Sequence, residues 1–239
     1  MPTLTDRFEQ VNARIAAAAT AAGRPADAVT LVAVSKTRSA DEVAALSRLG
    51  QRAFGESYLQ EALTKLDDLA GLDLEWHFIG PLQANKTRRV AEHFAWVHSI
   101  DRLKLARRLS DQRPADMPPL NVCLQVNISD EATKAGAKPE EALTLATEIA
   151  RLPRLRLRGL MAIPAPADDS AQARLPFRGL CQLAITIAAA GIPLDTLSMG
   201  MSGDLEAAVL EGATQVRIGT ALFGPRPPRD ALPGATGNQ

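Results

Sequence analysis

The chain has 239 residues, 46% apolar and 23% charged, a composition typical of a folded protein of one large or two small domains. Its formal net charge is zero and its acidic and basic residues are interspersed, which argues against nucleic-acid binding. No apolar run is long enough to cross a bilayer and the N-terminus lacks the pattern of a secretory signal, so we expect a cytoplasmic protein without membrane contact.

Strand-like and helix-like patterns alternate along the chain. An amphipathic segment at residues 7–22 predicts an N-terminal helix, which Gly23 ends. The β-branched run Val29–Ser35 is typical of a strand buried on both faces. Further strands are predicted at residues 52–55, 75–79, 96–100, 121–127, 157–162, 196–199 and 215–218. Helices are predicted between them at residues 40–49, 57–69, 83–93, 102–112, 139–151, 171–190 and 204–211.

This alternation predicts the fold. Strands that alternate with helices indicate parallel βαβ units, and about eight such units fit a closed barrel. We therefore expect an α/β protein with a single (β/α)₈ TIM barrel, an extra N-terminal helix and no C-terminal β-domain. An open doubly wound sheet is the alternative. The barrel domain is expected to span residues 1–225, followed by a flexible tail at 226–239 that is rich in Pro, Gly and small residues.

Lys36 is the first candidate for chemistry. It directly follows the first predicted strand, and active sites in such barrels lie at the C-terminal ends of the strands. A lysine that is partly removed from water has a lowered pKa and becomes a nucleophile able to form an imine with an aldehyde. The alternative is a lysine that reaches solvent from a strand end, and the position of Lys36 alone does not decide between the two.

The turns after the seventh and eighth strands resemble anion sites. Ser202 lies between glycines after the seventh strand, and Gly219 and Thr220 follow the eighth. Phosphate sites in these barrels are typically built from these two loops and a short helix N-terminus, where backbone N–H groups favour an anion. Either turn alone is ordinary loop chemistry. Two such turns together with a lysine at a strand end favour the reactive lysine over one that only reaches solvent.

Arg217 lies within the eighth predicted strand. If Ile218 packs outward, alternation points Arg217 into the barrel. A guanidinium facing a pyridine nitrogen would keep that nitrogen unprotonated and weaken the ring as an electron sink. The alternative is an arginine that pairs with Glu56 or Asp204 and links the ends of strands.

Several long stretches together carry a family resemblance that covers nearly the whole chain up to Gly224. The chain resembles the pyridoxal phosphate homeostasis proteins, which are similar to the N-terminal barrel of alanine racemase. The stretches are LVAVSKT, FGESYLQEA, EWHFIGPLQANK, VHSIDR, QVNISDEATKAG, RGLMAIPAP, LSMGMSGDLEAA and VRIGTALFG.

The resemblance implies a cofactor and the residues that hold it. Lys36 is expected to carry pyridoxal 5′-phosphate (PLP) as a Schiff base, with the phosphate held by Ser202 and by the turn at Gly219 and Thr220. It also places Arg217 near the cofactor and the segment around Asn85 along the pocket. Relatives usually have Asn where this chain has Ser57, so a contact from an asparagine amide is in doubt there.

The resemblance also implies a function without catalysis. Members are regarded as carriers or buffers of PLP in vitamin B6 homeostasis, so we expect a monomer that is not an enzyme, with PLP-dependent apo-enzymes as possible recipients. The chain ends soon after the barrel, and we expect no second domain to supply an opposing acid or base. The alternatives are a minimal PLP-dependent racemase or lyase, and a Schiff-base barrel of the aldolase kind that takes a sugar phosphate.

Other reactive side chains carry less information. Cys123 and Cys181 lack the spacing of a metal site and are interpreted as buried free thiols. His77, His93 and His98 are not spaced like zinc ligands either.

Overall fold

A computed structural model describes residues 2–129, 135–165 and 169–225. Its eight parallel strands pair in chain order, and β8 pairs with β1, which closes a barrel and rules out the open sheet. The predicted barrel is therefore confirmed. The tail predicted at residues 226–239 lies outside the described residues. The strands are β1 (Thr30–Val34), β2 (Ala53–Glu56), β3 (Glu75–Phe78), β4 (Trp96–Ile100), β5 (Leu120–Gln125), β6 (Leu155–Met161), β7 (Thr196–Ser198) and β8 (Gln215–Ile218).

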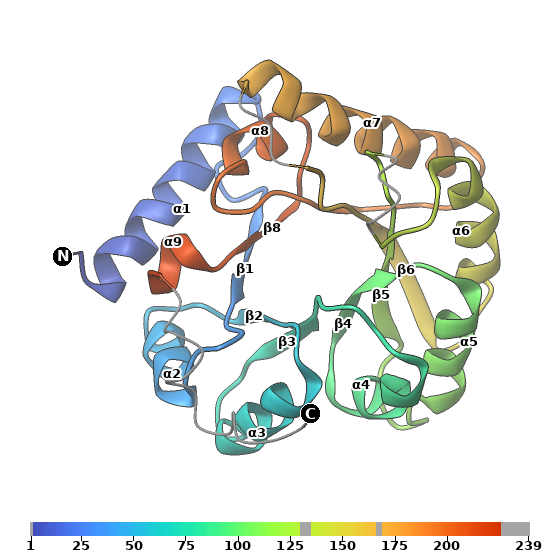
Figure 1. Cartoon of the computed structure of the whole chain (residues 1–239), viewed down its shortest axis with the longest axis horizontal. Coiled ribbons are helices and arrows are strands. Elements are labelled where there is room, and N and C mark those ends of the chain that lie inside the picture. Colours follow the sequence, from blue (N-terminus) through green and yellow to red (C-terminus); the bar gives the residue numbers. More distant parts are fainter. Residues whose placement is uncertain (1, 130–134, 166–168, 226–239) are drawn as a thin grey trace, which may run out of the picture.

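The helices form a ring around the strands (Figure 1). They bury their apolar faces against the outer surface of the barrel, in one contiguous core that includes Phe54, Phe78 and Phe177. No described helix is long and apolar enough to span a membrane. The α-helices are α1 (Leu4–Ala21), α2 (Ala40–Arg48), α3 (Leu59–Asp68), α4 (Thr87–His93), α5 (Leu103–Gln112), α6 (Ala142–Ala150), α7 (Ser170–Ala189), α8 (Leu205–Leu210) and α9 (Thr220–Phe223).

The extra N-terminal helix lies on the outside of the barrel. α1 packs against α8 and α9, next to the last strand (Figure 1). It begins earlier than predicted, because Thr3 and Asp6 form a capping box in which each side chain accepts the backbone N–H of the other residue. This packing brings side chains of α1 close to the loop that follows β7.

Two predicted helices are divided in the structure. The segment predicted at residues 83–93 begins as a 3₁₀ turn, η1 (Ala84–Lys86), and the one at residues 139–151 begins as η2 (Pro139–Glu141). Such turns are frequent at the N-termini of α-helices, because i→i+3 hydrogen bonds tighten the first turn. The division of the first segment affects the position of Asn85.

Candidate functional site

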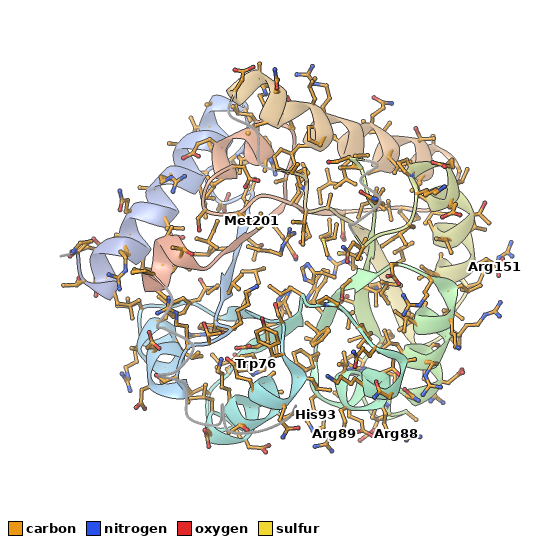
Figure 2. All side chains as sticks on the ribbon, viewed as in Figure 1. Trp76, Arg88, Arg89, His93, Arg151 and Met201 are labelled. Carbon is orange, nitrogen blue, oxygen red and sulfur yellow. The ribbon has the colours of Figure 1, made fainter. Side chains whose placement is uncertain are left out.

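A pocket of about 270 Å³ lies at the C-terminal ends of the strands. Its lining includes Lys36, Ser202, Arg217, Gly219 and Thr220, so the closed barrel brings a residue of β8 together with the loops after β1, β7 and β8. Figure 2 shows Met201, another lining residue, inside the helical ring, whereas Arg88, Arg89 and Arg151 lie on its outside. Five of the six residues expected from the sequence therefore share one cavity.

Asn85 is the predicted site residue that does not line this pocket. It lies in η1 with its side chain exposed. The loop after β3 reaches the cavity through Ile79 instead. Ser57, which stands where relatives usually have Asn, does line the pocket. The backbone of Gly80 lies close to that of Ser57, because a β-carbon at position 80 would lie 2.3 Å from the Ser57 carbonyl oxygen.

The backbone on both sides of Lys36 is held by side chains of α3. The carbonyl oxygen of Ser35 accepts a hydrogen bond from Lys65 Nζ at 2.7 Å, and the backbone N–H of Thr37 donates to Glu61 Oε1. Thr37 has a φ of 64°, which costs energy for a β-branched residue and persists only where its surroundings hold it. These contacts fix where the half-buried Lys36 leaves the strand end.

A buried charge cluster makes these contacts. Lys65 Nζ lies 2.8 Å from Glu56 Oε1 and 2.6 Å from Glu61 Oε1, and the Ser35 hydroxyl donates to Glu56 Oε1 at 2.7 Å. Burial raises the pKa of Glu56, against the lowering effect of Lys65. The second oxygen of Glu56 is buried without a hydrogen-bond partner in the described part of the chain. Burying these charged groups next to Lys36 therefore costs free energy of folding.

The two loops predicted to hold an anion meet at the pocket. The Ser202 hydroxyl accepts the backbone N–H of Ala221 at 3.3 Å, which places it against the first turn of α9 beside Gly219 and Thr220. Arg14 of α1 supports this loop from outside. It donates to the Ser202 carbonyl at 3.2 Å and pairs with Glu206 at 2.7 Å.

Arg217 points into the barrel, as alternation along β8 predicted. Its guanidinium donates to the carbonyl and the hydroxyl oxygen of Ser198 at 2.6 and 2.7 Å, and to the Ala162 carbonyl at 3.0 Å. These hydrogen bonds all go to neutral acceptors, and Arg217 forms no ion pair with Glu56 or Asp204 in the described structure, so the alternative pairing is wrong; Asp204 acts only as a nearby charge that raises the pKa of Arg217. Burial lowers the pKa of Arg217 to about 10, so the side chain stays charged at neutral pH.

The charges of the pocket favour an anionic ligand. Its lining contains three cationic side chains, Lys36, Arg38 and Arg217, and no acidic one among the described residues. A buried cation that bonds only neutral acceptors is stabilised by a bound anion. A pocket that is lined by the amine of Lys36, by the Ser202 hydroxyl and by the Gly219–Thr220 turn fits a molecule with an aldehyde at one end and a phosphate at the other.

Sequence reasoning missed several residues that shape the site. Arg38 follows Lys36 by two residues and packs 5.6 Å from the Phe223 ring. The cluster of Glu56, Glu61 and Lys65 lies in the stretch FGESYLQEALTK, where a helical spacing of four between Glu61 and Lys65 was the available signal.

The cysteines agree with the prediction in part. Both are free; Cys123 is buried, and burial raises the pKa of its thiol to about 12, but Cys181 is only half-buried. The described residues contain no group of three or more His, Cys, Asp or Glu side chains that could hold a metal ion.

Known proteins resemble this chain over nearly its whole length. Residues 8–227 match the family described as "Alanine racemase, N-terminal domain". The pyridoxal phosphate homeostasis protein of Pseudomonas aeruginosa is 58% identical over 226 residues, which cover 95% of this chain and 97% of that protein. The protein of the same name from Escherichia coli K12 is 52% identical over 232 residues, which cover 95% and 98%.

Solved structures agree with these matches. PipY of Synechococcus elongatus with PLP bound superposes with a TM-score of 0.77 at 37% identity, covering 88% of this chain and 100% of PipY. Alanine racemase of Corynebacterium glutamicum, at 18% identity and a TM-score of 0.66, shares the fold; the match covers 94% of this chain and 64% of the racemase. The chain therefore belongs to the family of pyridoxal phosphate homeostasis proteins, whose barrel is the one that forms the N-terminal domain of alanine racemase.

Proposed function

We propose that this protein binds PLP in the pocket at the C-terminal ends of the strands and serves in PLP homeostasis. The observation that carries this proposal is the lining of that pocket, in which a strand-end lysine, a serine and a glycine–threonine turn occur together with two arginines. The names of the curated relatives from Pseudomonas aeruginosa and Escherichia coli and the PLP bound to PipY support the same function.

Each part of the pocket has a distinct role in this proposal. Lys36 attaches the cofactor covalently through its ε-amino group, and Ser202, Gly219 and Thr220 hold the phosphate. Arg217 faces the pyridine ring with the N–H groups that its bonds to Ser198 and Ala162 do not use. Bound PLP supplies an electron-withdrawing ring conjugated to the attachment point.

We propose further that the protein carries PLP without turning over a substrate. Of the titratable side chains that line the pocket, Arg38 and Arg217 are arginines, so in the described residues only Lys36 is suited to proton transfer. Racemisation needs proton transfer groups on both faces of the reacting carbon. Alanine racemase shares the fold, so the side chains of the pocket, and not the fold, carry this proposal.

We propose that the carrier role includes delivery, by a cytoplasmic monomer, to PLP-dependent apo-enzymes. An accessible pocket supports delivery, because Ile163 in its lining is 40% exposed. Mixing the PLP-loaded protein with an apo-aminotransferase and following the recovery of aminotransferase activity tests it. The control is an amount of free PLP equal to all the PLP that the loaded protein carries. If aminotransferase activity recovers no faster with the loaded protein than with this free PLP, direct delivery is contradicted.

The binding proposal is tested by the visible absorbance of the purified protein incubated with PLP. We expect a yellow protein whose colour is lost on borohydride reduction, with the reduced adduct at Lys36 in peptide mass spectra. Lys36→Ala should give neither colour nor adduct, while Lys104→Ala, at an exposed position of α5, should give both. An adduct at Lys86, or at Lys134 outside the described residues, would show that the assignment of Lys36 is wrong.

A further inference from the structure

A line of hydrogen-bonded polar side chains crosses the interior of the barrel. It begins at Arg217 in the pocket, whose guanidinium donates to the Ser198 hydroxyl oxygen at 2.7 Å. Ser198 Oγ lies 2.7 Å from His98 Nδ1, and His98 Nε2 lies 2.9 Å from His77 Nδ1. His77 Nε2 then lies 2.9 Å from Glu75 Oε1. We call these five residues the interior chain.

The interior chain connects opposite ends of the molecule. Its members come from β8, β7, β4 and β3, and β4 lies across the barrel from β8 (Figure 1). Glu75 is the first residue of β3, so it lies at the N-terminal end of the strands, where it lines a separate open hollow of about 700 Å³. A polar path through a barrel interior is costly to bury, and its complete hydrogen bonding offsets that cost.

The two ends of the interior chain fix the direction of every hydrogen bond. Arg217 has only donors, so Ser198 Oγ accepts from it and its own proton goes to His98 Nδ1. His98 therefore carries its proton on Nε2 and donates to His77 Nδ1. His77 likewise carries its proton on Nε2 and donates to the Glu75 carboxylate, which only accepts. A cation at one end and a carboxylate at the other thus hold both histidines as neutral Nε2–H tautomers.

The surroundings of the two rings agree with this arrangement. Burial lowers the pKa of His77, and it lowers that of His98 well below its ordinary value, with His77 and Arg217 adding to the effect. The buried thiol of Cys123, on the neighbouring β5, has its pKa raised to about 12 and stays neutral. The rings of His77 and Trp96 stack with their centroids 5.4 Å apart. On Trp96, the guanidinium carbon of Arg158 lies 4.9 Å from the ring centroid, and Arg158 pairs with Asp195.

We propose that Ser198, His98, His77 and Glu75 are positioning residues for Arg217. They link the exposed carboxylate of Glu75, at the N-terminal end of the strands, to the PLP pocket at the C-terminal end. The interior chain orients the guanidinium of Arg217 so that its remaining N–H groups, which do not bond Ser198 or Ala162, face the ligand. Of the five guanidinium N–H groups, the hydrogen bonds to Ser198 and Ala162 use three within the described structure, which leaves two for the pocket.

Two variants distinguish an effect that passes along the interior chain from the effect of a changed charge at the N-terminal end of the strands. Glu75→Lys replaces the terminal acceptor by a donor, which opposes the direction of the whole interior chain. Reversal would put the proton of both histidines on Nδ1 and leave the Ser198 oxygen accepting from both sides. Asp73→Lys is the matched control: Asp73 is exposed and lines the same basal hollow, and the change of charge is the same, but Asp73 is not part of the interior chain.

The first measurement uses the protein without PLP and does not depend on the proposed function. Nitrogen-15 NMR of the imidazole rings reports which ring nitrogen carries the proton, and the chain has only three histidines. We expect His77 and His98 as Nε2–H tautomers in the wild type and in Asp73→Lys. In Glu75→Lys we expect His77 to change to the Nδ1–H form. A wild type with the opposite tautomers, or no change of His77 in Glu75→Lys, would overturn the proposal.

The second measurement follows PLP release from the loaded protein into excess apo-enzyme, and it rests on the proposed function. Ser198→Ala and Glu75→Lys should release PLP roughly two- to ten-fold faster than the wild type, the scale of one weakened hydrogen bond. Asp73→Lys should match the wild type. Equal rates in Glu75→Lys and Asp73→Lys would overturn the remote link, whereas a wild type that binds no PLP would refute the proposed function and leave the NMR result to decide the interior chain.

Glu75→Gln guards against a variant that fails to fold. It keeps an acceptor for His77 Nε2–H and removes only the charge. We expect the same tautomers as in the wild type and a rate of PLP release between those of the wild type and Glu75→Lys. A release rate for Glu75→Gln above that of Glu75→Lys would contradict a role for the direction of the hydrogen bonds.

Discussion

Replacing Lys65 by methionine tests whether Lys65 stabilises the buried charge cluster that it forms with Glu56 and Glu61. Lys65 Nζ donates to Ser35, Glu56 and Glu61 at 2.6–2.8 Å, so its three N–H groups are all used. The variant leaves Glu56, which is fully buried, without its counter-charge. Removing one partner of a buried pair costs about 3–5 kcal/mol, a large share of a total stability of about 5–15 kcal/mol.

The loss should depend on pH. Burial already raises the pKa of Glu56 above 4.5, and Lys65→Met removes the largest opposing cause. A group with a raised pKa in the folded protein favours folding below its unfolded pKa, and this contribution is lost as the pH rises through the folded pKa. The deficit of Lys65→Met relative to the wild type should therefore be smallest near pH 4.5 and grow towards pH 8.

Urea unfolding followed by circular dichroism at several pH values measures this deficit. With a slope of about 3 kcal/mol per M, the midpoint at pH 8 should fall by about 1–1.7 M. Lys104→Met, at an exposed lysine of α5, should change little. In the double variant with Glu56→Gln, the loss should become smaller and independent of pH. A deficit of Lys65→Met below about 1 kcal/mol at pH 8, or one that is no smaller near pH 5, would refute this account of the cluster.

Three further predictions follow from the pocket and the core. Ser202→Ala should weaken PLP binding roughly ten- to a hundred-fold, because it removes a charge-assisted hydrogen bond of about 1.5–3 kcal/mol. For the same reason, pyridoxal without phosphate should bind the wild type poorly. Equal retention of PLP and pyridoxal by the wild type, measured by dialysis and absorbance, would contradict this. Incubation of the PLP-loaded protein with L-alanine in deuterated water should give α-proton exchange far slower than about 1 s⁻¹ by NMR, and exchange near that rate would favour the minimal racemase or lyase. A thiol reagent at pH 8 should modify the half-buried Cys181 before the buried Cys123, whose pKa is raised to about 12, and rapid labelling of Cys123 in the folded protein would show that the core is open there.

The order of strands and helices could be predicted from the sequence because it follows from local patterns. A β-branched run such as Val29–Ser35 and the apolar periodicity of the helices record which faces are buried. In a parallel barrel all C-terminal strand ends lie on one face, so Lys36, Ser202 and Gly219 could be assigned to one site although they are far apart in the chain. The direction of Arg217 followed from alternation along β8.

Other features depended on how the segments pack. Asn85 came from the resemblance, and the 3₁₀ turn that exposes its side chain is a matter of local hydrogen bonding that the helical pattern does not encode. Lys65 reads as an ordinary helix lysine, and only the packing of α3 against the ends of β1 and β2 buries it against Glu56.

The interior chain shows this limit most clearly. His98 and Ser198 are 100 residues apart, and each lies in a short strand where a polar side chain has no local partner. Closure of the barrel brings β4 opposite β7 and β8 and lets these side chains meet. Local patterns determined the elements and the face that carries the site; contacts across the barrel, which form only when distant strands are brought together, decided the orientation of the charged groups within it.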